Sequence, residues 1–210
     1  MTEEEAQCWL RENLNVSADT MEQLATFAAY LHREAESQNL VAASTLNHIW
    51  SRHIADSAQL QALLPDKGWT SWLDLGSGAG FPGLVIAILS GKPVTLLESR
   101  ARRIEYLQRA LEMLDLEKNV TIAGMPLEKM KTQRFDVISA RAFAPLPRLL
   151  EGAARFSTEK TFWLLPKGRN AATELIEAQQ NWHLMFHVKQ SITDPEAGIL
   201  VGNVRGQRKK

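Results

Sequence analysis

The stretch LDLGSGAGFPG, residues 73–83, contains four glycines within its last eight positions. One apolar run precedes these glycines and another, residues 84–89, follows them, which predicts a strand, a tight turn and a helix. Each glycine costs conformational entropy on folding, so a turn that only reverses the chain seldom needs four. The turn is therefore expected to lie where a ligand approaches the backbone closely.

From Trp69 onward, short apolar runs alternate with longer amphipathic stretches. We expect seven strands, at residues 72–75, 94–98, 120–123, 135–139, 162–165, 183–190 and 199–204. Strands that alternate with helices predict a mostly parallel sheet covered on both faces. The last two runs are joined by SITDPEAG, which is too short for a crossover helix and predicts an antiparallel edge strand. The expected fold class is α/β, with a Rossmann-like, doubly wound, seven-stranded sheet.

The N-terminal part of the chain shows only helical patterns. Asp19 followed by Glu22 predicts the start of one helix, because this spacing resembles a capping box. Ser44 or Thr45 is expected to cap another helix that ends near Leu64, where Pro-Asp-Lys-Gly breaks the pattern. We therefore predict two parts, a helical N-terminal extension at residues 1–66 and the α/β domain at residues 67–210.

Composition narrows the class of protein. With 210 residues and 45% hydrophobic content, the chain can bury the core of one soluble domain. The single cysteine, Cys8, excludes an intramolecular disulfide framework and a cysteine-rich metal site. His48 and His53 lie five residues apart and diverge on a helix, so no metal is expected. The absence of a long apolar run and of a signal-like start predicts a cytoplasmic protein with no membrane segment, and we expect a monomer.

Charge is balanced overall but uneven along the chain. The 24 basic and 24 acidic residues give a formal net charge of zero. Basic residues gather in two places, at Arg100, Arg102, Arg103 and Arg109, and at Arg205, Arg208, Lys209 and Lys210. Such patches are either phosphate contacts or ordinary solvated surfaces, and charge alone does not decide between them.

Two ligands compete for the glycine turn. Gly78, Gly80 and Gly83 match the G-x-G-x-x-G pattern of dinucleotide sites, and Glu98 follows at the distance of a ribose-binding acid. Asp74, just before the turn, would repel a pyrophosphate, whereas S-adenosylmethionine carries a sulfonium and an ammonium. We therefore predict S-adenosylmethionine as the cofactor, in a class I methyltransferase fold.

Roles at this site follow from position in the predicted fold. The glycine backbone lets the methionine part approach, Phe81 forms a wall, and Glu98 accepts hydrogen bonds from the ribose. Leu127 and Glu128 follow the third strand, where the adenine edge is expected. The predicted cofactor-binding residues are Asp74, Gly76, Gly78, Phe81, Glu98, Leu127, Glu128 and Arg141.

The methyl acceptor is inferred by elimination from VISARAFAPLPRLL, residues 137–150. This segment has no Asn/Asp-Pro-Pro-aromatic tetrad for an exocyclic amine, and no cysteine that could attack a pyrimidine ring. Arg141 and Lys167 remain as positioning residues, and arginine cannot act as a general base. A ring nitrogen with a free lone pair, such as guanine N7, fits best, with catalysis by alignment. A hydrolytic triad of His53, Asp56 and Ser57 is not expected, because the sequence lacks the nucleophile elbow and the oxyanion loop of a hydrolase.

Several motifs together resemble one family, the bacterial 16S rRNA guanine-N7 methyltransferases, known as RsmG or GidB (glucose-inhibited division protein B). They are QNL (38–40), RHIADS (52–57), LDLGSGAGFPGLVIA (73–87), LLES (96–99), ARAFAPL (140–146) and PKG (166–168). The resemblance implies methylation of N7 of guanine 527 in the 530 loop, on 16S rRNA, the 30S subunit or an assembly intermediate. It implies donor contacts at Gly76, Phe81, Leu127, Glu128 and Arg141, and an RNA or guanine contact at Lys167.

Three other functions stay open on the sequence. One is a methyltransferase for another RNA site or a small molecule. Another is a non-catalytic donor-binding or ribosome-associated protein that acts through its helical extension and basic tail. The third is an oxidoreductase that uses a dinucleotide. Donor binding, dinucleotide binding and the modified nucleoside distinguish these alternatives.

Overall fold

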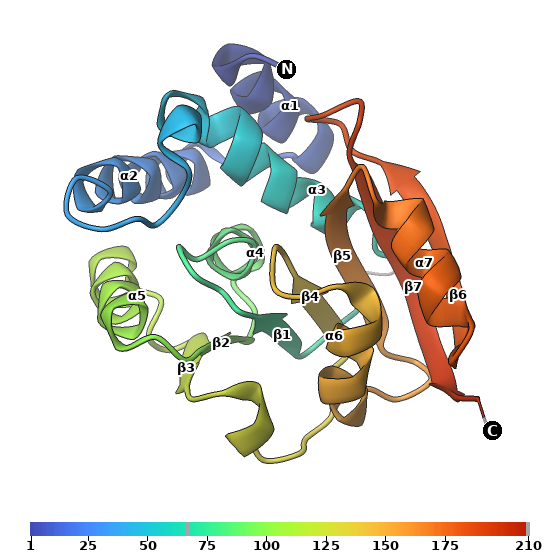
Figure 1. The fold of residues 1–210 in the computed structure, drawn as a ribbon. Coiled ribbons are helices and arrows are strands. Elements are labelled where there is room, and N and C mark those ends of the chain that lie inside the picture. Colours follow the sequence, from blue (N-terminus) through green and yellow to red (C-terminus); the bar gives the residue numbers. More distant parts are fainter. Residues whose placement is uncertain (66–67, 209–210) are drawn as a thin grey trace.

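The computed structural model describes residues 1–65 and 68–208 (Figure 1). One sheet has the strand order β3-β2-β1-β4-β5-β7-β6. The strands are β1 (Trp72–Leu75), β2 (Val94–Glu98), β3 (Val120–Gly124), β4 (Val137–Ala140), β5 (Phe162–Gly168), β6 (Trp182–Gln190) and β7 (Gly198–Gln207). The longer helices are α1 (Glu3–Leu14), α2 (Ala18–Glu34), α3 (Asp56–Ala62), α4 (Gly83–Ser90), α5 (Ala101–Leu114), α6 (Leu146–Ala153) and α7 (Ala171–Gln179). The predicted α/β class and all seven expected strands are confirmed.

Helices cover both faces of the sheet, and the alternation of side chains along β1 shows why. Leu73 and Leu75 point to one face and join the apolar core beneath α6 and α7. Trp72 points to the other face, where α2, α4 and α5 supply the surrounding apolar side chains. Parallel strands buried on both faces need this double cover. The sheet is thus doubly wound, with its order reversing between β1 and β4.

The last two strands form an antiparallel pair at one side of the sheet. β7 pairs antiparallel with both β5 and β6, so it lies inside the sheet, and β6 forms the edge. The expected antiparallel pair is confirmed, and the structure adds that its second strand is inserted between the first strand and β5. This insertion brings the start of β7 at Gly198 beside Gly168 at the end of β5.

The N-terminal helices differ in detail from the expected ones. Ser17, not Asp19, caps α2, because its hydroxyl accepts a hydrogen bond from the Thr20 amide. The expected helix near Thr45 is an irregular one, made of a 3-10 segment (η1, Ala43–His48), a π segment (η2, Trp50–Ala55) and α3. Neither Ser44 nor Thr45 is its N-cap, since η1 has no side-chain cap.

These helices share a core with the rest of the chain. The Tyr30 ring stacks on Tyr106 of α5 at 5.1 Å, and its hydroxyl donates to the Tyr106 carbonyl at 3.1 Å. Gln23 donates to the carbonyl of Leu114 at 2.7 Å. The predicted boundary at residues 66–67 lies outside the described residues. The helical extension therefore shares one apolar core with the α/β domain.

Within the described chain, no helix combines the length and apolar character needed to cross a membrane.

Candidate functional site

Two cavities lie at the edge of the sheet where the parallel strands end. The larger, of about 600 Å³, is lined by residues from η1, η2, the start of α3, the loop after β4, the end of β5, α7, the loop between β6 and β7 and the start of β7. The smaller, of about 210 Å³, is lined by the glycine turn, the end of β2 and the loops after β3 and β4. Loops at the carboxyl ends of strands are the usual ligand sites of such sheets.

Asp74 holds the glycine turn from beneath. Its carboxylate is fully buried and accepts hydrogen bonds from the Ser139 hydroxyl at 2.7 Å and from the Gly83 amide at 3.1 Å. Trp72 in turn donates to the Ser139 hydroxyl at 2.8 Å. Burial raises the pKa of Asp74 to about 6. In the structure this carboxylate anchors the turn to the sheet, and its contact with the donor stays a prediction.

The turn itself has the backbone geometry that glycine permits. Gly76 and Gly78 have φ of 70° and 56°, in the left-handed region that other residues rarely adopt. The Gly78 amide donates to Glu98 at 3.0 Å, and the amides of Ser99 and Arg100 donate to the other oxygen of the same carboxylate. Glu98 therefore joins the glycine turn to the end of β2 while lining the smaller cavity.

The predicted adenine contacts lie on the far side of this cavity. Leu127 is buried in a short 3-10 segment (η3, Leu127–Lys129) and lines both the smaller cavity and a neighbouring one of about 470 Å³. Glu128 is exposed and lines the neighbouring cavity but not the smaller one. The structure therefore brings Leu127 to the same cavity as Gly76 and Glu98, and places Glu128 in the neighbouring one.

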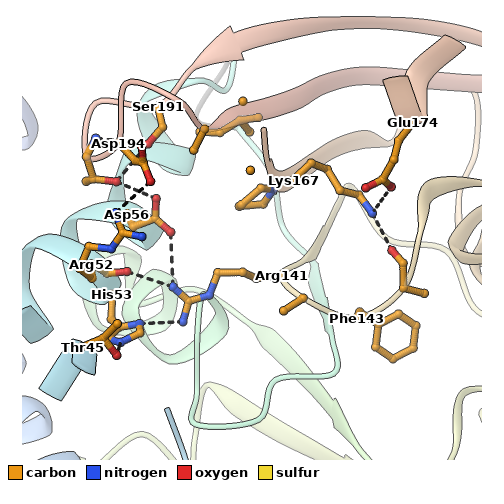
Figure 2. A pocket seen from close by; sticks show the side chains of 18 of the residues that line it. Thr45, Arg52, His53, Asp56, Arg141, Phe143, Lys167, Glu174, Ser191 and Asp194 are labelled. Atoms are coloured by element: carbon orange, nitrogen blue, oxygen red, sulfur yellow. Dashed lines mark hydrogen bonds and ion pairs between the residues drawn. The ribbon is translucent and has the colours of Figure 1, made fainter. Parts of the chain in front are cut away.

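Arg141 lies at the centre of the larger site (Figure 2). Its guanidinium donates to Asp56 and to the Arg52 carbonyl, both at 3.3 Å, and to Nδ1 of His53 at 3.1 Å. It also lies 5.0 Å from the centre of the buried Phe81 ring. Burial lowers the pKa of Arg141 and the carboxylate of Asp56 opposes that shift. The guanidinium stays charged, with donors left over for a ligand in the cavity.

His53 is the neutral partner that orients this guanidinium. Its pKa is lowered to about 3, first by burial and then by the charges of Arg141 and Arg52. Because Arg141 donates to Nδ1, the proton of His53 sits on Nε2 and is donated to Thr45, 2.8 Å away. The ring also stacks on Phe81 with centroids 5.0 Å apart. His53 is thus a wall of the site, and it is a weak base because its pKa is lowered and Arg141 occupies its Nδ1.

Lys167 fixes the loop that follows β4. Its ammonium donates to the Ala144 carbonyl at 2.6 Å and forms an ion pair with Glu174 at 2.9 Å. Glu174 also accepts a hydrogen bond from the Leu146 amide at 2.7 Å. Although Lys167 lines the larger cavity, its side chain is only 8% exposed and already engaged. In the structure it is therefore a positioning residue for the loop that carries Arg141.

The loop between β6 and β7 closes the other side of the larger cavity (Figure 2). Thr193 donates to Asp56 at 2.9 Å, and Asp194 forms an ion pair with Arg52 at 3.0 Å. Gln59 of α3 accepts from the Ile192 amide at 3.0 Å. Helical extension, central sheet and C-terminal hairpin therefore meet at one site.

Sequence reasoning identified part of this assembly. It identified RHIADS (52–57) as one of the family motifs, and the structure places His53 and Asp56 of that segment around Arg141. Ser57 is not part of any triad, because its hydroxyl donates to the His53 carbonyl within the helix. The lining residues that were missed include Phe143, Glu174 and Thr193. The isolated aromatic in ARAFAP was an available signal, whereas the other two lie in ordinary helix and turn sequence.

Comparisons with known proteins show which family and fold this chain resembles. The family model described as GidB, rRNA small subunit methyltransferase G, matches residues 20–199. The ribosomal RNA small subunit methyltransferases G of Novosphingobium aromaticivorans and Sphingopyxis alaskensis are 54% and 52% identical, over 97% and 99% of this chain and 89% of each relative. An O-methyltransferase from Bacillus cereus, solved in complex with SAH, has a similar fold, with a TM-score of 0.62, 15% identity and coverage of 94% of this chain and 96% of that one. Across the described residues, no three His, Cys, Asp or Glu side chains form a potential metal site.

Proposed function

This chain belongs to the rRNA small subunit methyltransferase G family, and from that premise we propose that it methylates N7 of guanine 527 in the 530 loop of 16S rRNA. S-adenosylmethionine is the methyl donor of this family and fold. The observation that supports N7 is the larger cavity, where every charged side chain that could serve as a base is already paired.

The residues around the glycine turn fit the donor. At Gly76 and Gly78 the backbone is bare, so a ligand can lie directly on it. Glu98 offers a carboxylate to ribose hydroxyls, and Leu127 offers an apolar surface to adenine. Arg141 supplies free guanidinium donors that suit the carboxylate of the methionine part. When bound, the donor supplies a methyl group on a sulfonium, whose carbon–sulfur bond breaks toward sulfur as an acceptor lone pair bonds the carbon.

The larger cavity suits an acceptor that loses no proton. Asp56 is paired with Arg141, Asp194 with Arg52, and Glu174 with Lys167. The neighbouring His53 is neutral and its Nδ1 already accepts a hydrogen bond. Guanine N7 has a free lone pair, so its methylation requires alignment rather than a base. These residues hold the base and the loop in place, and the reaction depends on that positioning.

The partner follows from the same proposal. We infer that the substrate is 16S rRNA within the 30S subunit or an assembly intermediate, which places the protein in the bacterial cytoplasm. We also propose that the protein acts as a monomer. Arg100 and Arg103 line the smaller cavity at the N-terminus of α5, where they can meet phosphates next to the methyl-transfer site.

The test is transfer of a labelled methyl group from S-adenosylmethionine to 30S subunits or 16S rRNA that lack the mark, with the product nucleoside identified. We expect labelled N7-methylguanosine at position 527 with the wild-type protein and a loss of at least about 100-fold in kcat/KM with Arg141→Ala, since a buried charged partner is removed. Arg205→Ala is the matched control, because this exposed arginine lies toward the far end of β7 and its ion pair with Glu159 is a surface one.

Other outcomes of this assay have clear meanings. Label in a different nucleoside would keep the donor site and overturn the guanine-N7 proposal. Donor binding without transfer to any ribosomal substrate would favour a non-catalytic or small-molecule function instead.

A further inference from the structure

Phe143 occupies an unusual position beside the glycine turn. Its side chain is 38% exposed, and within residues 1–65 and 68–208 it is the one exposed ring among the Phe, Tyr and Trp side chains. A side chain at Gly76 would collide with this ring, so the ring covers the face of the turn where the backbone is bare. Phe143 also lines the smaller, the larger and the neighbouring cavities. It is therefore the partition between them.

The partition divides residues that one ligand should contact together. Glu98 and Leu127 line the cavity on one side of Phe143, and Arg141 lines the cavity on the other side. The smaller cavity measures about 210 Å³, below the roughly 300–1,000 Å³ of small-molecule sites. A donor that spans from Leu127 to Arg141 across Gly76 has to displace the Phe143 ring.

Contacts hold the residues on either side of Phe143 in place. Arg141 is held by Asp56 and His53 on one side. On the other side the Ala144 carbonyl is held by Lys167. Figure 2 shows Phe143 on the side of the cavity away from His53, near the Lys167 anchor. Of the two neighbours of Phe143, Ala144 is fixed by its hydrogen bond to Lys167. Ala142 is strained, because its φ of 52° is rare for alanine.

We propose that the Phe143 ring leaves Gly76 when the donor binds and then stacks on the acceptor base in the larger cavity. This inference rests on the proposed function, because it requires a nucleobase as acceptor. Enzymes that modify a base inside RNA commonly hold it against an aromatic or apolar side chain. Phe143 is the exposed aromatic that borders both the donor and the acceptor spaces, so it couples the filling of one to the binding of the other.

Three variants separate the two parts of the proposal. Phe143→Ala removes both the obstacle and the stacking surface, Phe143→Leu keeps bulk without an aromatic ring, and Phe143→Tyr keeps the ring. Donor affinity is measured by calorimetric titration of S-adenosylmethionine into the protein without RNA. Methyl transfer to 16S rRNA or 30S subunits gives kcat and KM, and thermal unfolding checks that each variant is folded.

For Phe143→Ala we expect opposite changes in the two measurements. Donor affinity rises by about threefold or more, since the binding-competent state no longer has to expel the ring. Methyl transfer falls in kcat/KM by roughly 5- to 150-fold, the range for loss of one base–aromatic stack. Phe143→Leu keeps donor affinity near wild type but loses transfer, and Phe143→Tyr keeps both.

A purely structural role would not give this pattern. Unchanged or weaker donor binding by Phe143→Ala would overturn the displacement of the ring, and full transfer activity by Phe143→Leu would overturn the stacking. If the wild-type protein transfers no methyl group to ribosomal RNA, the proposed function fails by that result, whereas the donor titrations still decide whether Phe143 gates the donor site.

Discussion

His53 fixes the position of Arg141 through a single ring nitrogen. The ring is neutral and accepts a hydrogen bond from the guanidinium at Nδ1. In His53→Ala this acceptor is lost beside a buried charge, and hydrogen bonds to charged groups contribute about 1.5–3 kcal/mol. We therefore expect the Kd for S-adenosylmethionine to rise about tenfold or more, measured by calorimetric titration.

His53→Asn is the matched control, because its amide oxygen can replace Nδ1 as the acceptor. We expect its donor affinity to stay within about threefold of wild type. If His53→Asn and His53→Ala weaken donor binding equally, stacking of the ring on Phe81 rather than the hydrogen bond to Arg141 positions the site.

Titration of Asp74 is expected to make the free energy of unfolding depend on pH. Burial raises its pKa from 3.8 to about 6, so between these pH values the folded chain binds more protons than the unfolded chain. The free energy of unfolding therefore falls as the pH rises from about 4 to about 6, by about 3 kcal/mol for this group. In Asp74→Asn this component is absent, whatever the change in overall stability.

The measurement is urea unfolding at several pH values from 4 to 7 for wild type and variant. The difference between the two curves should change across pH 4–6 and level off above it. Asp115→Asn, at the exposed end of α5, controls for the loss of one negative charge. Parallel curves for wild type and Asp74→Asn would show that Asp74 is ionised in both states throughout this range.

At the scale of elements, α3 is tied to the C-terminal hairpin by Gln59. This buried amide accepts from the Ile192 amide and donates to Ser191 and Asp56. Gln59→Ala leaves the Ile192 amide without this partner and removes two further hydrogen bonds, so we expect the free energy of unfolding to fall by about 1–3 kcal/mol and the Tm by roughly 3–8 °C. Gln61→Ala, two residues along and half-buried, should change the free energy of unfolding by less than about 0.5 kcal/mol. If the two substitutions lowered the free energy of unfolding equally, the hydrogen bonds of Gln59 to the C-terminal hairpin would not stabilise the fold.

The elements themselves were largely predictable from sequence, for a physical reason. A parallel strand that is buried on both faces is mostly apolar, so β1 and β2 were predicted at their observed ends although they contain Asp74, Thr95 and Glu98. The irregular helix before α3 was not, because its 3-10 and π segments carry the same apolar spacing as a regular helix. The Ser17 cap was missed since Asp19 and Glu22 also match a capping pattern two residues later.

At the scale of the whole molecule, the site depends on contacts that local patterns do not encode. The segment with His53 and the segment with Arg141 were both recognised as motifs, but their pairing requires the helical extension to pack against the end of β4. The bond between Asp56 and Thr193 further requires β7 to lie beside β5. For Asp74 the sequence shows the charge but not the burial, so its anchoring of the glycine turn could not be predicted.

The charge of the whole molecule does not favour RNA binding, because 24 basic and 24 acidic residues give no net attraction for RNA. Binding then depends on local patches, and the patch nearest the site is at the N-terminus of α5. There Arg100, Arg102 and Arg103 line a groove of about 560 Å³ with Asn39, and two of these arginines also line the smaller cavity. Each arginine that meets a phosphate adds about 0.7–0.9 to the slope of log affinity against log salt concentration.

We therefore expect Arg102→Ala to reduce the magnitude of this slope by about 0.7–0.9 for 16S rRNA, measured by filter binding at several salt concentrations, without changing donor affinity. Arg102 is exposed and acts as a charge on the surface. Lys118→Ala is the control of equal charge, because Lys118 is also exposed but precedes β3, at the edge of the sheet opposite the site. An unchanged slope for Arg102→Ala, or an equal change for Lys118→Ala, would mean that the RNA does not approach along α5, and the arginines there would be ordinary solvated surface.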